Sequence, residues 1–196
     1  IYSNLYKTES VVAEFPGSSI AESFRNLRSS LFLRLRSEPV KVILVTSAQP
    51  RDGKSFIAFN LAASIASVGY KTILLDCDLR RPTMHEKFRE DNSSGLSVYM
   101  ARQASKDEII HKTFVPNLSF IPAGPQLPNP SELMESGILD DLMTALKNKY
   151  EYIILDTTPV GIIADATLLM KHAAQILIVC RNNYTRKDVF TEVINN

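Results

Sequence analysis

The 196-residue chain contains only two cysteines, almost no net charge and no long apolar run. Cys77 and Cys180 each end an apolar stretch, which favours reduced, buried thiols in a cytoplasmic protein over a disulfide framework. A formal net charge of +1 argues against bulk binding of nucleic acid or of a strongly acidic partner. No apolar run approaches the roughly 20 residues of a membrane-spanning helix, and no signal peptide is present. Because the chain begins at Ile1 rather than Met, we expect it to be a piece of a longer protein.

Apolar segments alternate with helical ones along the chain, and 45% apolar content suits one domain with a sizeable core. Short, apolar, partly β-branched runs predict buried strands at 40–48, 71–78, 117–124, 150–159 and 174–180. Helical spacing and caps predict helices at about 19–36, 54–68, 129–149, 165–173 and 186–196, with shorter ones at 83–89, 96–101 and 106–111. We therefore expect an α/β fold that is doubly wound, with a mostly parallel sheet and helices on both faces. Residues 1–17 form an N-terminal extension, and 18–196 form the domain.

The stretch LVTSAQPRDGKSFIAFN, from Leu44, has the layout of a phosphate-binding loop between a strand and an alanine-rich helix. Such a loop needs backbone N–H groups at a helix N-terminus, a lysine for the outer phosphates and a hydroxyl for Mg²⁺. Gly53, Lys54 and Ser55 supply these parts in order. The glycine that a Walker A pattern has six residues before the lysine is missing, because Ala48 stands there. Read alone, the segment could also be a simple turn with a helix cap.

Carboxylates follow two other predicted strands. Asp76 and Asp78 end one of them and Asp156 ends another. Ligands bind at the carboxyl ends of strands in such sheets, and residues two apart on a strand point the same way. Two like charges on one side repel unless a cation or a proton lies between them, so one of the pair would face Mg²⁺ and leave the other free to accept a proton. Each aspartate alone could instead be a cap or pair with Arg80 or Arg81. All three beside one phosphate loop predict a nucleotide site.

Five motifs resemble those of the bacterial tyrosine kinases that regulate capsule and exopolysaccharide synthesis and export. SAQPRDGKS resembles the Walker A loop of this family, ILLDCDLRRP its Walker A′ motif and YIILDTTP its Walker B motif. GPQLPNPSELM resembles a family hallmark, and ESFRNLR matches its E-x-x-R-x-x-R helix. The resemblance runs from about Ile20 to Cys180 and implies the P-loop kinase fold with ATP and Mg²⁺ as cofactors.

The resemblance also implies a role for each site residue. Lys54 would contact the β- and γ-phosphates, and Ser55, Asp78 and Asp156 would hold Mg²⁺. Asp76 would be the base that takes the proton of the attacking tyrosine. The nucleotide-binding residues would be Gln49, Pro50, Arg51, Asp52, Gly53, Lys54, Ser55 and Phe56.

Partners are implied in the same way. Glu22, Arg25 and Arg28 would build a ring-forming homo-oligomer, although their spacing alone fits a solvated helix face with a local ion pair. The substrate would be the tyrosine-rich C-terminal tail of a neighbouring subunit, which is absent from this chain, and the final strand of the family's sheet is absent as well. A membrane-embedded polysaccharide co-polymerase or adaptor segment would be the second partner. The domain would then work at the cytoplasmic face of the bacterial inner membrane, without nucleic acid.

Two departures from the family pattern leave other functions open. Arg51 replaces a small residue in the loop, and Thr158 stands where the family usually has a second proline. A nucleotide-binding, non-catalytic assembly regulator of the same export machinery is therefore one alternative. A partitioning-type ATPase of the same fold is another, but its signature lysine, five residues before Lys54, is replaced by Gln49.

Overall fold

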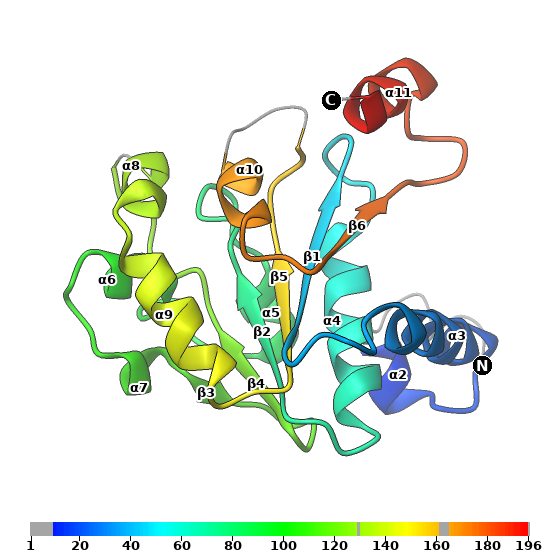
Figure 1. The fold of residues 1–196 in the computed structure, drawn as a ribbon, viewed down its shortest axis with the longest axis horizontal. Coiled ribbons are helices and arrows are strands. Elements are labelled where there is room, and N and C mark those ends of the chain that lie inside the picture. The colour runs from blue at the N-terminus through cyan, green and yellow to red at the C-terminus, as the bar shows by residue number, and fades with distance from the viewer. Residues whose placement is uncertain (1–9, 129, 161–164, 196) are drawn as a thin grey trace.

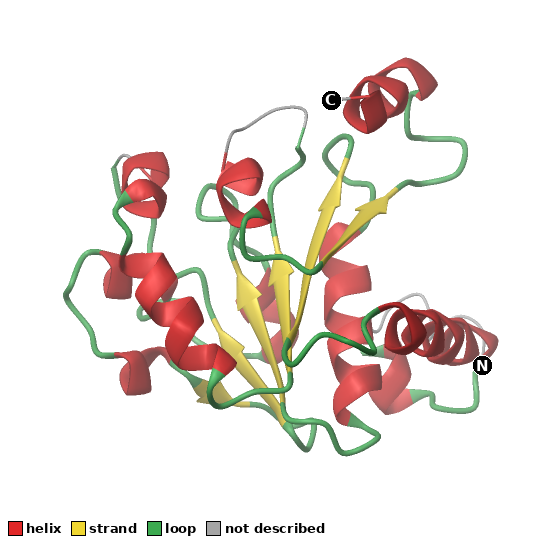
Figure 2. Ribbon diagram, viewed as in Figure 1, coloured by secondary structure: helices red, strands yellow, loops and turns green. Residues whose placement is uncertain are grey.

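A six-stranded sheet runs through the middle of the molecule (Figures 1 and 2). The computed structural model describes residues 10–128, 130–160 and 165–195. The strand order is β3-β4-β2-β5-β1-β6. The strands are β1 (Lys41–Ser47), β2 (Thr72–Asp76), β3 (His111–Lys112), β4 (Leu118–Ile121), β5 (Tyr152–Asp156) and β6 (Gln175–Val179).

All strand pairs are parallel except β3 with β4. Asp76 at the end of β2 lies directly opposite Asp156 at the end of β5. Asp156 in turn lies opposite Val45, near the end of β1, where the phosphate loop begins. The parallel register therefore brings the three predicted motifs to one edge of the sheet, as expected for a doubly wound fold.

Helices cover both faces of the sheet, as Figure 1 shows. One layer contains α2 (Val11–Glu14), α3 (Ser19–Arg34), α4 (Lys54–Ala66) and α5 (Met84–Phe88). The other contains α6 (Leu96–Met100), α7 (Lys106–Ile109), α8 (Pro130–Glu135), α9 (Ile138–Lys147) and α10 (Asp165–Met170). Alternate residues of β1 enter the two cores: Ile43 packs with the α4 layer and Leu44 with the α9 layer. The predicted fold class is confirmed.

The structure corrects four details of the sequence-based expectations. The helix expected over 129–149 is two helices, α8 and α9, separated at Gly137, whose φ of 76° is left-handed. The expected cap, Asn129, lies outside the described residues. The expected helix at 106–111 is shorter, since His111 belongs to β3, and α2 was not expected at all. Cys180 is exposed rather than buried, whereas Cys77 is fully buried.

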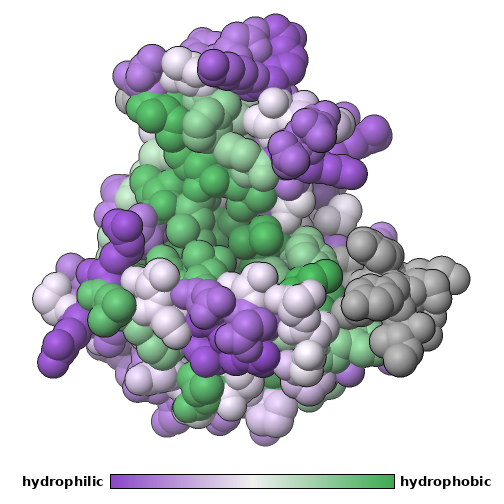
Figure 3. Space-filling model, turned by 90° about the vertical axis from the view of Figure 1, so that its right-hand side faces the viewer, coloured by the Kyte–Doolittle hydropathy of each residue, from purple (hydrophilic) through white to green (hydrophobic). Residues whose placement is uncertain are grey.

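The sheet is least covered along β6. All five residues of this strand are partly exposed, whereas all five of β5 are buried. Figure 3 shows an apolar patch on this side of the molecule, below a polar cap. The helix that follows, α11 (Lys187–Asn195), has no buried residue. Within the described part of the chain, no helix combines the length and the apolar composition needed to cross a membrane.

Candidate active site

The phosphate loop is braced by its own side chains. Ser47 Oγ donates to the Gln49 carbonyl oxygen at 2.8 Å, and the Gln49 N–H donates to Asp52 Oδ2 at 3.2 Å. The other oxygen of Asp52 accepts a hydrogen bond from Thr185 Oγ1 at 2.8 Å. Gly53 is the N-cap of α4 and has a φ of 97°, the left-handed geometry that glycine adopts without strain. The missing glycine causes no backbone strain at position 48 itself, because Ala48 is not among the residues with a positive φ.

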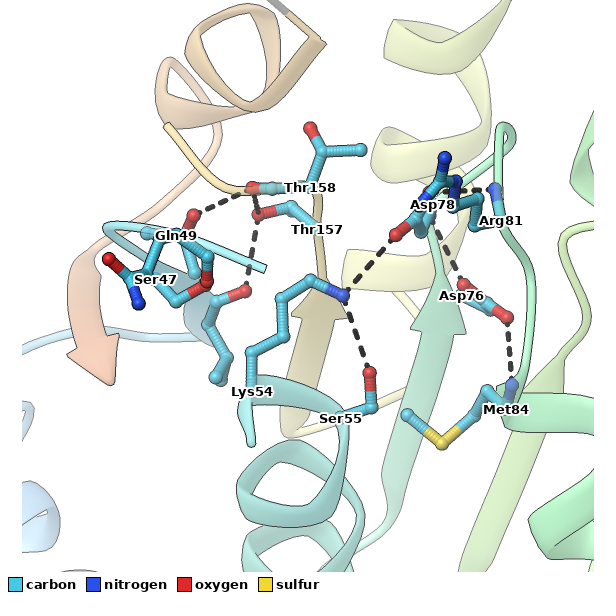
Figure 4. A network of polar contacts seen from close by, with 12 residues as sticks. Ser47, Gln49, Lys54, Ser55, Asp76, Asp78, Arg81, Met84, Thr157 and Thr158 are labelled. Atoms are coloured by element: carbon cyan, nitrogen blue, oxygen red, sulfur yellow. Dashed lines mark hydrogen bonds and ion pairs between the residues drawn. The ribbon is translucent and has the colours of Figure 1, made fainter. Parts of the chain in front are cut away.

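Lys54 lies at the centre of the polar network in Figure 4. Its Nζ is 3.3 Å from Asp78 Oδ2 and 3.5 Å from Ser55 Oγ. Burial lowers the pKa of Lys54. The negative charges of Asp156, Asp78 and Asp76 raise it by more than burial lowers it, so the pKa lies above its usual value. The acidic groups therefore favour the charged ammonium form of Lys54.

The three aspartates differ in their surroundings. Asp76 and Asp156 are each 1% exposed, whereas Asp78 lies on the wall of the cleft. The Asp76 carboxylate accepts backbone hydrogen bonds from Asp78 at 3.1 Å and from Met84 at 3.2 Å, so its position is fixed. Burial and the charge of Asp156 raise the pKa of Asp76 to about 8. Burial also raises the pKa of Asp156 to about 6, although Lys54 opposes that shift.

A divalent cation suits this donor set. Asp156 Oδ1 is buried and, among the described residues, has no hydrogen-bond partner. Ser55, in the first turn of α4, donates its hydroxyl hydrogen to the same carboxyl group. The described residues contain no group of three or more His, Cys, Asp or Glu side chains able to hold a metal on their own. Mg²⁺ usually keeps several waters and binds through one or two carboxylates plus phosphate oxygens, so this arrangement fits it.

A cleft of about 1040 Å³ opens above these residues. Six of the eight predicted nucleotide-binding residues line it: Pro50, Arg51, Gly53, Lys54, Ser55 and Phe56. The volume remains with the Arg51 side chain in place, and it is large enough for a nucleotide. The other two, Gln49 and Asp52, brace the loop instead, and Gln49 also donates to the Tyr184 carbonyl oxygen at 3.2 Å.

A second polar network beside the cleft was not predicted from the sequence. Arg80 Nε donates to Asp165 Oδ2 at 3.0 Å, and Ser131 Oγ donates to Asp165 Oδ1 at 2.7 Å. Arg80 Nη2 also donates to Ser131 Oγ at 2.9 Å, and Asp165 is 1% exposed. The network joins the segment after β2, the start of α8 and the start of α10. The one sequence signal for this network was the PNPSEL motif, which contains Ser131.

The predicted oligomer residues lie on α3, outside the cleft. Glu22 and Arg25 form an exposed ion pair of 2.6 Å. Arg28 Nη1 donates to the Ser64 carbonyl oxygen at 2.6 Å and thereby ties α3 to α4 within the same chain. All of these contacts lie within one subunit.

The fold and the site define a P-loop nucleotide-binding domain. The family model described as "AAA domain" matches residues 40–195. Tyrosine-protein kinase YwqD of Bacillus subtilis is 32% identical over 173 residues, which are 88% of this chain and 73% of that protein. Tyrosine-protein kinase Wzc of Salmonella typhimurium is 32% identical over 177 residues, but the chain spans only 25% of its length. The chain belongs to the bacterial tyrosine-protein kinases.

Solved structures agree with this placement. The chimerical protein CapA2B2 superposes with a TM-score of 0.91 at 35% identity, covering 95% of this chain and 82% of that one. The kinase domain of the Escherichia coli tyrosine kinase ETK gives a TM-score of 0.91 at 28% identity, covering 95% and 73%. The septum site-determining protein MinD of Pyrococcus horikoshii, complexed with Mg-ADP, is 20% identical with a TM-score of 0.68, which shows a shared fold.

Proposed function

We propose that this chain transfers the γ-phosphoryl group of Mg–ATP to protein tyrosine. The tyrosine Oη attacks the γ-phosphorus, the bond to the β–γ bridging oxygen breaks, and ADP leaves with the bonding electrons. The proton of Oη passes to the Asp76 carboxylate, which the positive charge of a bound Mg²⁺ would keep ionised against the burial that raises its pKa in the ligand-free chain. Lys54 and the N–H groups at the start of α4 balance the charge of the β- and γ-phosphates.

The metal would be held by Ser55, Asp78 and Asp156. When bound, Mg²⁺ would neutralise negative charge on the phosphates, while these three residues would hold it in place. Asp76 is suited to proton acceptance because burial and the charge of Asp156 raise its pKa to about 8, while two backbone hydrogen bonds fix the direction of its oxygens.

One observation carries the proposal: a single ammonium lies against the carboxylate end of two neighbouring strands. Lys54 Nζ contacts Asp78, while Asp76 and Asp156 are register partners at the ends of β2 and β5. A nucleotide phosphate and its metal need this combination of one cation, one hydroxyl and several carboxylates.

The direct test is phosphotyrosine formation. The chain, with whatever segments flank it in the natural protein, is incubated with ATP and Mg²⁺ and analysed by phosphotyrosine immunoblot and mass spectrometry. Lys54→Met and Asp76→Asn versions should lose labelling at least about 100-fold, as expected when a group that acts in the transition state is removed. A labelled wild-type protein with equally labelled variants contradicts the assigned roles. Tight ATP binding without any phosphotyrosine favours the non-catalytic regulator instead.

The wider setting follows from the family. We propose that the kinase regulates capsular or exopolysaccharide synthesis and export at the cytoplasmic face of the inner membrane. Its proposed partners are a membrane-embedded polysaccharide co-polymerase or adaptor segment and the tyrosine-rich tail of a neighbouring subunit. Glu22, Arg25 and Arg28 would contribute to a ring-forming homo-oligomer, which light scattering of the triple alanine variant tests: an unchanged mass contradicts it.

A further inference from the structure

The cleft contains more positive charge than a nucleotide site needs. Its lining includes six cationic side chains and one acidic one, Asp78. Two of the cations are already paired, Lys54 with Asp78 and Arg80 with Asp165. The positive charge of Lys87 lowers the pKa of Asp156. Arg51 belongs to the phosphate loop. Two exposed arginines of the cleft wall, Arg81 and Arg181, have no assigned role.

Arg81 and Arg181 lie on opposite sides of the phosphate loop. Arg81 follows β2 and Arg181 follows β6, and β5 and β1 lie between these two strands. Three strand-to-strand steps of about 4.8 Å separate β2 from β6, which gives roughly 14 Å between the two sides of the cleft. A ligand that contacts both arginines must therefore cross the cleft above Lys54.

Both guanidinium groups are available to an anion. Among the described residues, no carboxylate forms an ion pair with either of them. Arg81 is held through its backbone, whose N–H donates to Asp78 Oδ1 at 3.0 Å. The Arg181 guanidinium lies over the Tyr184 ring at 5.2 Å. Stacking of this kind holds the plane of the guanidinium and leaves its N–H edge free for a carboxylate or a phosphate.

An extended peptide has the right length to reach both groups. At about 3.3 Å per residue, four residues cover roughly 14 Å. We propose that the acceptor tyrosine lies in an anionic peptide segment, with negative groups about two residues before and after it that bind Arg81 and Arg181. The negative group is a carboxylate of Glu or Asp, or the phosphate of a tyrosine phosphorylated earlier. This specificity rests on the proposed kinase function and adds the substrate class.

Peptide kinetics test the proposal. Four synthetic peptides carry one acceptor tyrosine and differ only at the positions two residues before and after it: Gln, Glu, phosphotyrosine or Lys. KM and kcat are measured for the full chain, for Arg81→Gln, for Arg181→Gln and for the double variant. Arg36→Gln is the matched control, because Arg36 is exposed and lies before β1, at the opposite end of the strands. The KM for ATP is measured in parallel, and binding of acceptor-free Phe versions of the peptides is measured by fluorescence anisotropy with ADP and Mg²⁺.

We expect each single variant to raise KM for the Glu peptide roughly two- to fivefold, the effect of one exposed charge pair. The double variant should raise it about tenfold, and KM values for the Gln peptide and for ATP should not change. A larger effect on the phosphotyrosine peptide than on the Glu peptide would assign the arginines to phosphate, and the reverse to carboxylates. Equal KM values for the Gln and Glu peptides overturn the proposal, as does an increase in the KM for ATP alone. If no peptide is labelled, the kinase function fails, and the anisotropy arm still decides whether the two arginines bind anionic peptide.

Discussion

Replacement of Lys54 by Met tests whether the ammonium and the carboxylates form one balanced cluster. Lys54 Nζ is 3.3 Å from Asp78 Oδ2, and the two side chains are only 15% and 12% exposed. The same ammonium also interacts electrostatically with the carboxyl groups of Asp76 and Asp156. Its removal therefore leaves Asp78 without its ion-pair partner and takes from Asp156 the stronger of the two cations that act on it, Lys54 and Lys87.

The expected cost follows from the burial of the pair. Removal of one partner of a buried ion pair lowers the free energy of unfolding by about 3–5 kcal/mol. The residual exposure of the pair and proton uptake by the carboxylates both reduce this cost, so we expect a loss of about 3 kcal/mol. For a chain of this size, each kcal/mol shifts Tm by about 2–4 °C, so we expect Tm to fall by roughly 6–12 °C at pH 8.

The assay is calorimetry of Lys54→Met, Asp78→Asn and the double variant. Because both changes remove the same interaction, the double variant should lose about 1–3 kcal/mol less free energy of unfolding than the two single variants lose together. Lys171→Met is the control, since Lys171 is an exposed cation 2.8 Å from Asp140 and its exposed pair should contribute less than about 1 kcal/mol. The reasoning is refuted if Lys54→Met destabilises no more than Lys171→Met, or if the two site variants are additive.

Three further predictions concern the ligand-free chain. The pKa of Asp76, raised to about 8 by burial first and the nearby carboxylates second, means that this group stabilises the fold while protonated. That stability is complete below the ordinary carboxyl pKa of about 4 and is lost as the pH rises through 8, so Tm should fall from pH 6 to pH 9 and Asp76→Asn should flatten the fall. Arg80→Met should lower the free energy of unfolding in urea by about 2–3 kcal/mol, because it leaves buried Asp165 without its cation. Gly95→Ala should cost at least about 1–3 kcal/mol, because a Cβ there would lie 2.3 Å from a backbone oxygen, whereas Gly17→Ala should be nearly neutral.

Each of these has a contrary outcome. A Tm that rises between pH 6 and pH 9, with the same slope in Asp76→Asn, would show that the carboxyl is ionised in the folded chain. An Arg80→Met variant as stable as the wild type would mean that Asp165 is solvated. Equal stability of the two glycine variants would contradict the close approach of residues 95 and 122.

The arrangement of the site was predictable because each motif ends a strand. The parallel register follows from strands that alternate with helices, and it brings the ends of β1, β2 and β5 together. The two cores were predictable from the composition of the strands, because apolar runs without alternation indicate strands that are buried on both faces.

Other features depend on contacts that no local pattern encodes. The break between α8 and α9 depends on a left-handed Gly137, and glycine inside a helical pattern is often tolerated without a break. The exposure of Cys180 follows from the edge position of β6, which only the sheet order reveals. The network around Asp165 joins residues 51 and 85 positions apart from Arg80, so only the folded chain shows it.

The measurement that tests the central claim most directly is the Mg²⁺ dependence of ATP binding by titration calorimetry. If one ammonium, one hydroxyl and the carboxylates of two strands surround the same Mg–ATP, Kd for ATP should fall at least about tenfold on addition of Mg²⁺, a gain of about 1.4 kcal/mol. Ser55→Ala and Asp156→Asn should each reduce that ratio toward one while ATP alone still binds. A ratio that stays the same in both variants would contradict the account, because the metal would then be held elsewhere.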